Sequence, residues 1–176
     1  MTILNEEILS YVGVTTDEFW AGEPVERGAV RRFSQAIMDH DPAYWDESAA
    51  QRYGGPVAPP LYPIFAFRKE FGAPDELAEN ADDPGYDGAS GGSIPGLPEI
   101  MAFRGFGILN GGSEIEIHRF ARIGERIKMR SRYDSIFEKE TSKGPMVFIL
   151  IVSEYLNDAD ELLVKVQRTT IRRPVQ

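Results

Sequence analysis

The segment Val57-Ala58-Pro59-Pro60-Leu61-Tyr62-Pro63-Ile64-Phe65-Ala66-Phe67 decides the fold. Prolines are tolerated in the first turn of a helix, and Pro63 is compatible with a helix only if it also lies there. The residues that follow, to position 71, are apolar almost all round. Such a pattern predicts a helix over residues 61–71 that is buried on every side.

Downstream of this helix the periodicity changes to that of strands. Apolar and polar residues alternate over residues 114–118, 127–133 and 162–167. The run 146–152 is continuously apolar and predicts a central strand covered on both faces. Residues 157–160 predict the turn before the last strand. A sheet wrapped around one apolar helix is an α+β arrangement, the hotdog fold, in which an antiparallel sheet surrounds a central buried helix.

Upstream, residues 26–38 predict an amphipathic helix, because Val30, Phe33 and Ile37 fall on one face. Pro42 then ends it, since the residue before a proline disfavours helical geometry. A second, short helix is expected over residues 46–53, with Asp46 as its N-cap.

Residues 1–176 are expected to form a single domain, since a chain of this length suits one core. The exception is residues 72–98, which are rich in glycine and proline, and whose charged residues are all acidic. Structureless loops this long are uncommon and are often functional. The segment is therefore either a surface insertion or a lid over an active-site tunnel.

Composition excludes several classes of protein. The sequence has no cysteine, which rules out disulfides and thiol catalysis and fits a cytoplasmic location. The formal net charge of −9 argues against a nucleic-acid binder. No apolar stretch reaches the ~18 residues of a membrane span, so we expect no membrane association. The first residues lack the basic start and apolar run of a signal peptide.

The segment that suggests a chemistry is Phe33-Ser34-Gln35-Ala36-Ile37-Met38-Asp39-His40-Asp41-Pro42-Ala43-Tyr44. It resembles the motif of MaoC-like (R)-specific enoyl-CoA hydratases, in which Gly-Asp-x-Asn-Pro-x-His follows an aromatic residue and a short helix end. Asp39 falls on the catalytic aspartate of that motif. Asp41 stands at the asparagine, Pro42 at the proline and Tyr44 at the catalytic histidine.

Further segments carry the same resemblance, which covers roughly residues 20 to 173. Residues 54–63 look like the start of the central hotdog helix, residues 109–119 resemble the second strand, and residues 120–127 resemble a conserved turn. The chain is most similar to the N-terminal, FAS1-like dehydratase half of members with two hotdog halves. The resemblance implies a hotdog fold and hydration of an enoyl-CoA, or the reverse dehydration.

Hydration of a conjugated thioester requires a base that activates water and an acid that protonates the α-carbon. An aspartate and a histidine on one loop hold the water in this family. Tyr44 replaces that histidine, and a tyrosine with a pKa of about 10 is a poor proton shuttle at neutral pH. The catalytic candidates are therefore Asp39, with Tyr44 or the neighbouring His40 as an unconventional acid. The alternative is that Asp39 and His40 are turn residues and that Tyr44 is packing or pocket wall.

The candidate substrate-binding residues lie in two places. The resemblance assigns Pro59, Pro60, Leu61 and Tyr62 to the helix start whose N–H groups stabilise the enolate-like oxygen. Asn110-Gly111-Gly112 is either a strand bulge or a contact with the thioester arm. Four arginines are candidates for CoA phosphates or are ordinary surface residues: Arg104, Arg119, Arg122 and Arg126. We expect no metal and no cofactor, the CoA thioester being the substrate.

These observations predict a subunit of an enoyl-CoA hydratase or 3-hydroxyacyl-CoA dehydratase. The resemblance implies that it is the supporting, tunnel-forming half of a heteromeric complex, paired with a second MaoC-like hotdog subunit that carries the Asp and His. The alternatives are a self-sufficient homodimeric hydratase that uses Asp39, a hotdog acyl-CoA thioesterase, and a thioester-binding protein without turnover. In each case acyl-CoA is the expected ligand.

Overall fold

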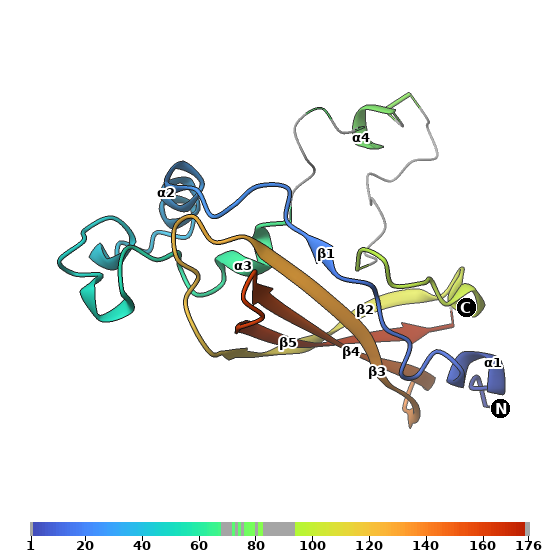
Figure 1. The fold of residues 1–176 in the computed structure, drawn as a ribbon. Coiled ribbons are helices and arrows are strands. Elements are labelled where there is room, and N and C mark those ends of the chain that lie inside the picture. Colours follow the sequence, from blue (N-terminus) through green and yellow to red (C-terminus); the bar gives the residue numbers. More distant parts are fainter. Residues whose placement is uncertain are drawn as a thin grey trace.

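The computed structural model describes residues 2–67, 72, 74, 76–79, 81–82 and 94–174, and within them five antiparallel strands form one sheet with the order β1-β3-β4-β5-β2 (Figure 1). The strands are β1 Phe19–Trp20, β2 Gly107–Ile117, β3 Ile127–Thr141, β4 Gly144–Asn157 and β5 Leu162–Arg173. The helices are α1 Glu6–Leu9, α2 Arg27–Ala36, α3 Tyr62–Phe65 and α4 Glu76–Glu79, with 3-10 turns Pro42–Tyr44, Gln51–Tyr53 and Met101–Phe103. The strand-rich C-terminal half predicted from the alternation is confirmed.

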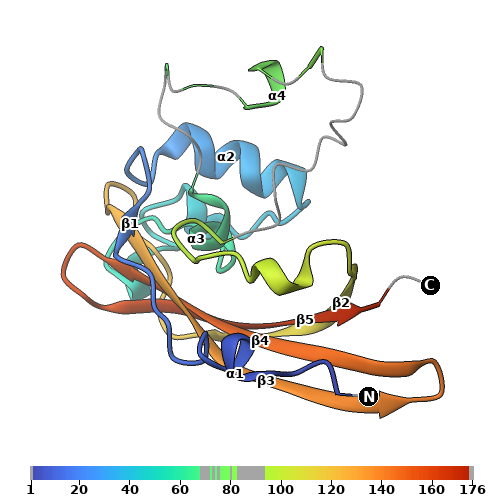
Figure 2. The same cartoon turned by 90° about the vertical axis from the view of Figure 1, so that its right-hand side faces the viewer.

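Helix α3 lies against the inner face of the sheet, which confirms the hotdog arrangement (Figures 1 and 2). Phe67, just beyond it, packs on Tyr155 of β4 with ring centroids 5.6 Å apart. Two features differ from the sequence prediction. The helix ends at Phe65, well before position 71, and residues 68–71 lie outside the described residues. Phe65 is also 54% exposed, because the sheet and α2 cover only two sides of this helix.

The predicted helix over residues 26–38 is confirmed as α2, with Glu26 as N-cap and Ile37 as C-cap. The predicted short helix over residues 46–53 is wrong in type, since turns lead into a 3-10 helix, Gln51–Tyr53. Asp46 caps the turns before this 3-10 helix, because its Oδ1 accepts hydrogen bonds from the backbone N–H groups of Ser48 and Ala49. The predicted turn after β4 is confirmed, with Asn157 accepting backbone N–H groups inside it.

Two apolar clusters fill the inner face of the sheet. One lies under α2 and α3 and includes Val30 and Tyr62. The other lies at the far end, where Ile8 of α1 and Leu97 pack on Tyr133. Tyr133 donates a hydrogen bond of 2.8 Å to the carbonyl of Pro98, so residues at the end of the segment 72–98 belong to the core. Most of that segment, and with it the question of a lid, lies outside the described residues.

The opposite, outer face of the sheet carries no helix of the described chain (Figure 2). The run 146–152 lies in β4, at the centre of the sheet as predicted. The described residues cover this strand fully on its inner face only, so the expected coverage on both faces is not seen among them. Val147 and Ile149 point inward and are buried, whereas Phe148 and Leu150 point outward and are only partly buried.

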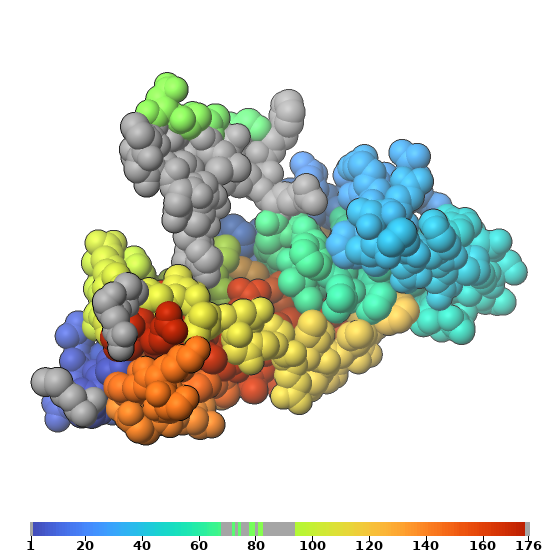
Figure 3. All heavy atoms as spheres, turned by 180° about the vertical axis from the view of Figure 1, so that it is seen from behind, coloured from blue at the N-terminus to red at the C-terminus, as the bar shows by residue number. Residues whose placement is uncertain are grey.

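Strand β2 forms one edge of the sheet and lies at the surface in the view from behind, where it is yellow (Figure 3). Every residue of β2 after Gly107 is exposed. Four of them are large apolar residues: Ile108, Leu109, Ile115 and Ile117. An exposed apolar edge strand is a template for pairing with another chain.

Candidate active site

Asp39 is positioned by the way α2 ends. The N–H of Met38 donates to the carbonyl of Gln35, and the N–H of Asp39 donates to the carbonyl of Ser34. These two bonds form a Schellman motif, which requires a left-handed residue at its corner. Met38 takes that conformation, with a φ of 57°. The chain therefore turns sharply away from the helix, and Asp39 is the third residue beyond its last residue, Ala36.

Tyr44 is brought to Asp39 by the 3-10 turn that follows. Oδ1 of Asp41 accepts a hydrogen bond from the N–H of Ala43, and Pro42 occupies the first position of the turn. Tyr44 is thereby buried in the main core cluster. Its hydroxyl group donates a hydrogen bond of 2.6 Å to Oδ2 of Asp39. The structure thus joins the two residues that the motif assigned to the catalytic pair.

Burial raises the pKa of Tyr44 well above its ordinary value, and the hydrogen bond to Asp39 and the charges of Asp39 and Asp41 raise it further. The phenol therefore stays protonated over the whole neutral range. Its O–H group is already engaged in the hydrogen bond to the Asp39 carboxylate, so the donor of Tyr44 is satisfied within the pair. An imidazole at position 44 would exchange a proton near neutral pH, and a buried phenol does not.

His40 does not join this pair. The side chain is exposed, and within the described residues no hydrogen bond links it to Asp39 or Tyr44. Trp45 packs edge-on against Tyr44, with ring centroids 6.3 Å apart, and is 52% exposed. The hydrogen-bond partners of the Asp39 carboxylate are therefore the Tyr44 phenol and the backbone N–H of Asp41, which donates to Oδ1 at 3.3 Å.

The start of α3 supplies few free N–H groups. Pro59 and Pro63 are fully buried and, like Pro60, have no N–H. The N–H of Tyr62 donates to the carbonyl of Pro59 at 2.9 Å. Leu61, the N-cap, is the one residue of the expected four with an N–H that makes no backbone hydrogen bond within the described chain. With a single such donor, the helix start does not form the pair of donors typical of an oxyanion hole.

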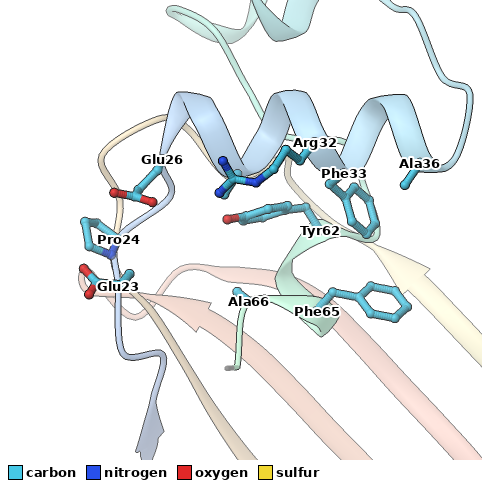
Figure 4. Close-up of a pocket in the computed structure, with 10 residues that line it drawn as sticks. Glu23, Pro24, Glu26, Arg32, Phe33, Ala36, Tyr62, Phe65 and Ala66 are labelled. Atoms are coloured by element: carbon cyan, nitrogen blue, oxygen red, sulfur yellow. The ribbon is translucent and has the colours of Figure 1, made fainter. Parts of the chain in front are cut away.

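A pocket of about 330 Å³ lies between α2 and α3 (Figure 4). Phe33, Tyr62 and Phe65 form an aromatic wall, with Phe33 packing on Tyr62 at 5.6 Å and on Phe65 at 5.4 Å between ring centroids. The other end is charged, with Glu23 and Glu26 at the rim and the Arg32 guanidinium group on the side of the Tyr62 hydroxyl (Figure 4). Three alanines, Ala29, Ala36 and Ala66, leave the space between these groups.

Of the predicted binding residues, only Tyr62 lines this pocket. Phe33 was predicted as part of the apolar stripe of a helix and Arg32 as part of its opposite, polar face, so neither was expected to line a pocket. The alanines at positions 29 and 36 were the available signal, because small residues beside an aromatic one leave a hollow where two helices meet. The alanines form a pocket only because α3 lies opposite them, and the hydrophobic periodicity of the sequence does not show how two helices are placed.

Asn110-Gly111-Gly112 forms the predicted bulge in β2, where the register with β5 shifts between Asn110 and Ser113. Oδ1 of Asn110 accepts a hydrogen bond from the N–H of Gly112, whose φ is 101°. A Cβ on Gly111 would lie 2.6 Å from Cγ2 of Thr169. The glycines are thus required by the strand itself, and contact with a thioester arm stays a prediction.

The four arginines considered for CoA phosphates all have partners within the chain. Arg119 bonds to Glu125 at 2.6 Å and to Glu161 at 2.8 Å. Arg104 pairs with Glu99, Arg122 donates to the carbonyl of Tyr53, and Arg126 stacks over Trp20. Among the described residues no group of three or more metal-ligating side chains is placed to hold an ion, and no helix is long and apolar enough to cross a membrane.

Comparison with known proteins defines the class. Residues 10–166 match the family described as the FAS1-like, dehydratase domain region, and the chain belongs to that family. The probable enoyl-CoA hydratase alpha subunit of Thermomonospora curvata is 27% identical over 96% of this chain. The chain spans about half the length of that curated relative, 51%.

Two solved structures share the fold. A chain of the ChsH1–ChsH2 complex from Mycobacterium tuberculosis matches with a TM-score of 0.67, at 20% identity, over 92% of this chain and 86% of that one. The MaoC-like dehydratase from Rhodospirillum rubrum matches with a TM-score of 0.57, at 19% identity, over 92% and 95%. The resemblance to MaoC-like hydratases and the hotdog fold are therefore both confirmed.

Proposed function

We propose that this chain is a subunit of an enoyl-CoA hydratase, acting also as a 3-hydroxyacyl-CoA dehydratase, and that it supplies the acyl-binding half of a two-hotdog complex. Hydration adds the oxygen of water to the β-carbon and a proton to the α-carbon of the thioester. A second MaoC-like subunit supplies the aspartate and histidine that perform these proton transfers.

The hydrogen bond between Tyr44 and Asp39 carries this proposal. A general base must accept a proton from water and pass one on, which requires a group that titrates near the working pH. Asp39 is bound by a phenol whose raised pKa keeps it protonated. The start of α3 also lacks the second donor needed beside a developing oxyanion. Both deficiencies concern the chemical step. Neither affects the pocket between α2 and α3, which can still bind an acyl group.

The pocket between α2 and α3 supports the acyl-binding role. Its volume of about 330 Å³ is at the lower end of the range for small-molecule sites, and its aromatic wall is suited to an apolar chain. Phe65, at the end away from Glu23 and Glu26, is half exposed, so the apolar end of the pocket is open on that side (Figure 4). An acyl chain that enters there buries apolar surface against Phe33 and Phe65.

Strand β2 is the proposed contact for the second subunit. Its outward edge has unpaired backbone groups, and its inner face shows Ile115 and Ile117, each at least 40% exposed. A strand added here would extend the sheet and cover these residues. The ChsH1–ChsH2 structure is that of a complex, which supports a heteromeric assembly for this chain. A self-dimer along the same edge is the alternative assembly.

The decisive assay compares the purified chain alone with the complex co-purified from the native host, using crotonyl-CoA and longer enoyl-CoAs. We expect hydration by the complex and none by the isolated chain. Turnover by the chain alone identifies a self-sufficient hydratase. Release of free CoA thiol identifies a thioesterase, and absence of activity in both preparations identifies a binding protein without turnover.

The acyl-binding role has its own test in the complex. Ala29→Leu places a larger side chain in the pocket, and Gln35→Leu places the same side chain on the exposed face of α2 as a matched control. We expect Ala29→Leu to raise KM for long-chain enoyl-CoAs about tenfold or more, with crotonyl-CoA little affected. Equal effects on short and long substrates would contradict an acyl site between α2 and α3.

A further inference from the structure

The outer face of the sheet is organised in rows that run across four strands. Side chains that pair directly on neighbouring strands share a face, so the strand register defines each row. One row is Arg130 of β3, Glu154 of β4, Lys165 of β5 and Glu116 of β2. Its charges alternate in sign from one edge of the sheet to the other. Arg130 pairs with Glu154 at 2.7 Å and Lys165 with Glu116 at 2.8 Å.

A second row on the same face is entirely apolar. It consists of Phe137, Phe148, Ile171 and Leu109, again one residue from each strand. The two phenylalanine rings are parallel, with centroids 5.3 Å apart. Leu109 is 41% exposed, and the other three residues are only partly buried. No described helix lies on this side (Figure 2), and the described group over the two rings is the ammonium of the exposed Lys139, 5.2 Å from each ring centroid.

When this row of four alternating charges is placed opposite the same row in reverse order, each charge faces one of opposite sign. A two-fold axis parallel to the strands, between β4 and β5, places a second copy face to face with the first and reverses the order of its strands. Glu154 then faces Lys165 of the second copy, and Arg130 faces its Glu116. The same operation sets Phe148 opposite Ile171 and Phe137 opposite Leu109. Charge therefore meets opposite charge, and apolar residues meet apolar residues, at every position of the two rows.

We propose that the outer face of this sheet is an interface between two copies of this chain, related by that two-fold axis. The inference does not depend on the proposed hydratase function. It is also separate from the contact proposed for the second subunit, which uses the edge of β2 and leaves the outer face free. Two heteromeric units joined through this face would form a dimer of heterodimers.

Charge exchange tests the interface in the full-length chain, with the mass in solution measured by light scattering over a concentration series. Glu154→Lys sets two lysines against each other across the axis, and we expect the mass to halve. Adding Lys165→Glu to the same chain restores opposite charges across the axis, and we expect the original mass to return. Glu47→Lys, which breaks an exposed ion pair with Arg27 outside the sheet, is the matched control and should leave the mass unchanged.

A wild-type mass of one copy, an unchanged mass for Glu154→Lys, or a double exchange that stays dissociated would each overturn the proposal. Thermal unfolding of every variant verifies that dissociation is not unfolding.

Because the chain has no cysteine, crosslinking gives a second, independent measurement. A Glu154→Cys chain mixed with a Lys165→Cys chain should form a disulfide between the two under mild oxidation. Glu154→Cys alone should crosslink much less, since the two 154 positions do not face each other. Equal crosslinking of all mixtures, or none, would contradict the two-fold arrangement.

Discussion

The Tyr44 hydroxyl group lies 2.6 Å from Oδ2 of Asp39 and donates a hydrogen bond to that carboxylate. The relationship is local in sequence, because the Schellman end of α2 and the 3-10 turn Pro42–Tyr44 together fold the chain back on itself. It places a buried, protonated phenol where the family motif has an imidazole. The effects of this hydrogen bond on the stability of the protein and on its activity can be measured separately.

Tyr44→Phe removes the donor to Asp39 while keeping the buried ring. We expect a loss of about 1–2 kcal/mol in the free energy of unfolding, since a hydrogen bond to a carboxylate is lost and its acceptor stays partly buried. Asp39→Asn is the matched control, because its amide oxygen still accepts the Tyr44 proton. Urea unfolding of the three proteins makes the comparison, and a Tyr44→Phe variant as stable as the wild type would show that the bond contributes nothing.

Stability at alkaline pH depends on the same phenol. Burial raises the pKa of Tyr44, and it also raises the pKa values of Tyr133 and Tyr155. In the unfolded chain these groups ionise near the ordinary pKa of about 10. Their contribution is therefore complete below about pH 10 and is lost as the pH rises towards the folded pKa values. Tyr44→Phe should flatten this alkaline decline, and an identical pH dependence in the variant would contradict the raised pKa.

Met38→Gly should stabilise the protein. Met38 is 80% exposed and has a left-handed φ of 57°, so its side chain contributes little packing and its backbone is strained. Glycine adopts this conformation freely, and we expect a gain of about 1 kcal/mol in the free energy of unfolding. Met38→Ala keeps the strain and should be close to wild type. A glycine variant less stable than the alanine variant would rule out this explanation.

Gly111→Ala should destabilise the edge of the sheet by about 1–3 kcal/mol, because the added methyl group overlaps the side chain of Thr169. Thr169→Ser removes the methyl group that would lie 2.6 Å away and should recover part of the loss in the double variant. Gly105→Ser, at a glycine whose added Cβ meets nothing within 4 Å but whose φ is 80°, separates steric overlap from backbone strain. Absence of any recovery in the double variant would show that the overlap is with the Cβ and the carbonyl oxygen of Thr169, each 3.0 Å from the added Cβ, and not with its methyl group.

The periodicity of the sequence predicted the sheet, its central strand and helix α2, because each depends on residues close together in the chain. The closeness of Asp39 and Tyr44 could also be expected from the sequence, since only five positions separate them and Pro42 forms a turn between them. What periodicity did not predict was exposure. Phe65 and Phe148 look like core residues in the sequence, yet among the described residues no element covers one side of α3 or the outer face of the sheet.

The pocket could not be predicted for a related reason. It forms where the alanines of α2 meet Tyr62 and Phe65, which are far apart in the sequence, and its position depends on how two helices cross. The helix start at residue 61 was predicted to within one residue, but a count of free N–H groups requires the hydrogen bond that Tyr62 makes to Pro59. Surface arginines likewise acquire internal partners only in the folded chain.

The hydration rate of crotonyl-CoA by the purified chain alone tests the central claim most directly. The account predicts no hydration above the uncatalysed rate, and full activity once the second hotdog subunit is added. In that complex, replacing Asp39 by Asn and Tyr44 by Phe in this chain should leave kcat nearly unchanged. Rapid hydration by the chain on its own, abolished by Asp39→Asn, would contradict the claim that a second subunit supplies the catalytic aspartate and histidine.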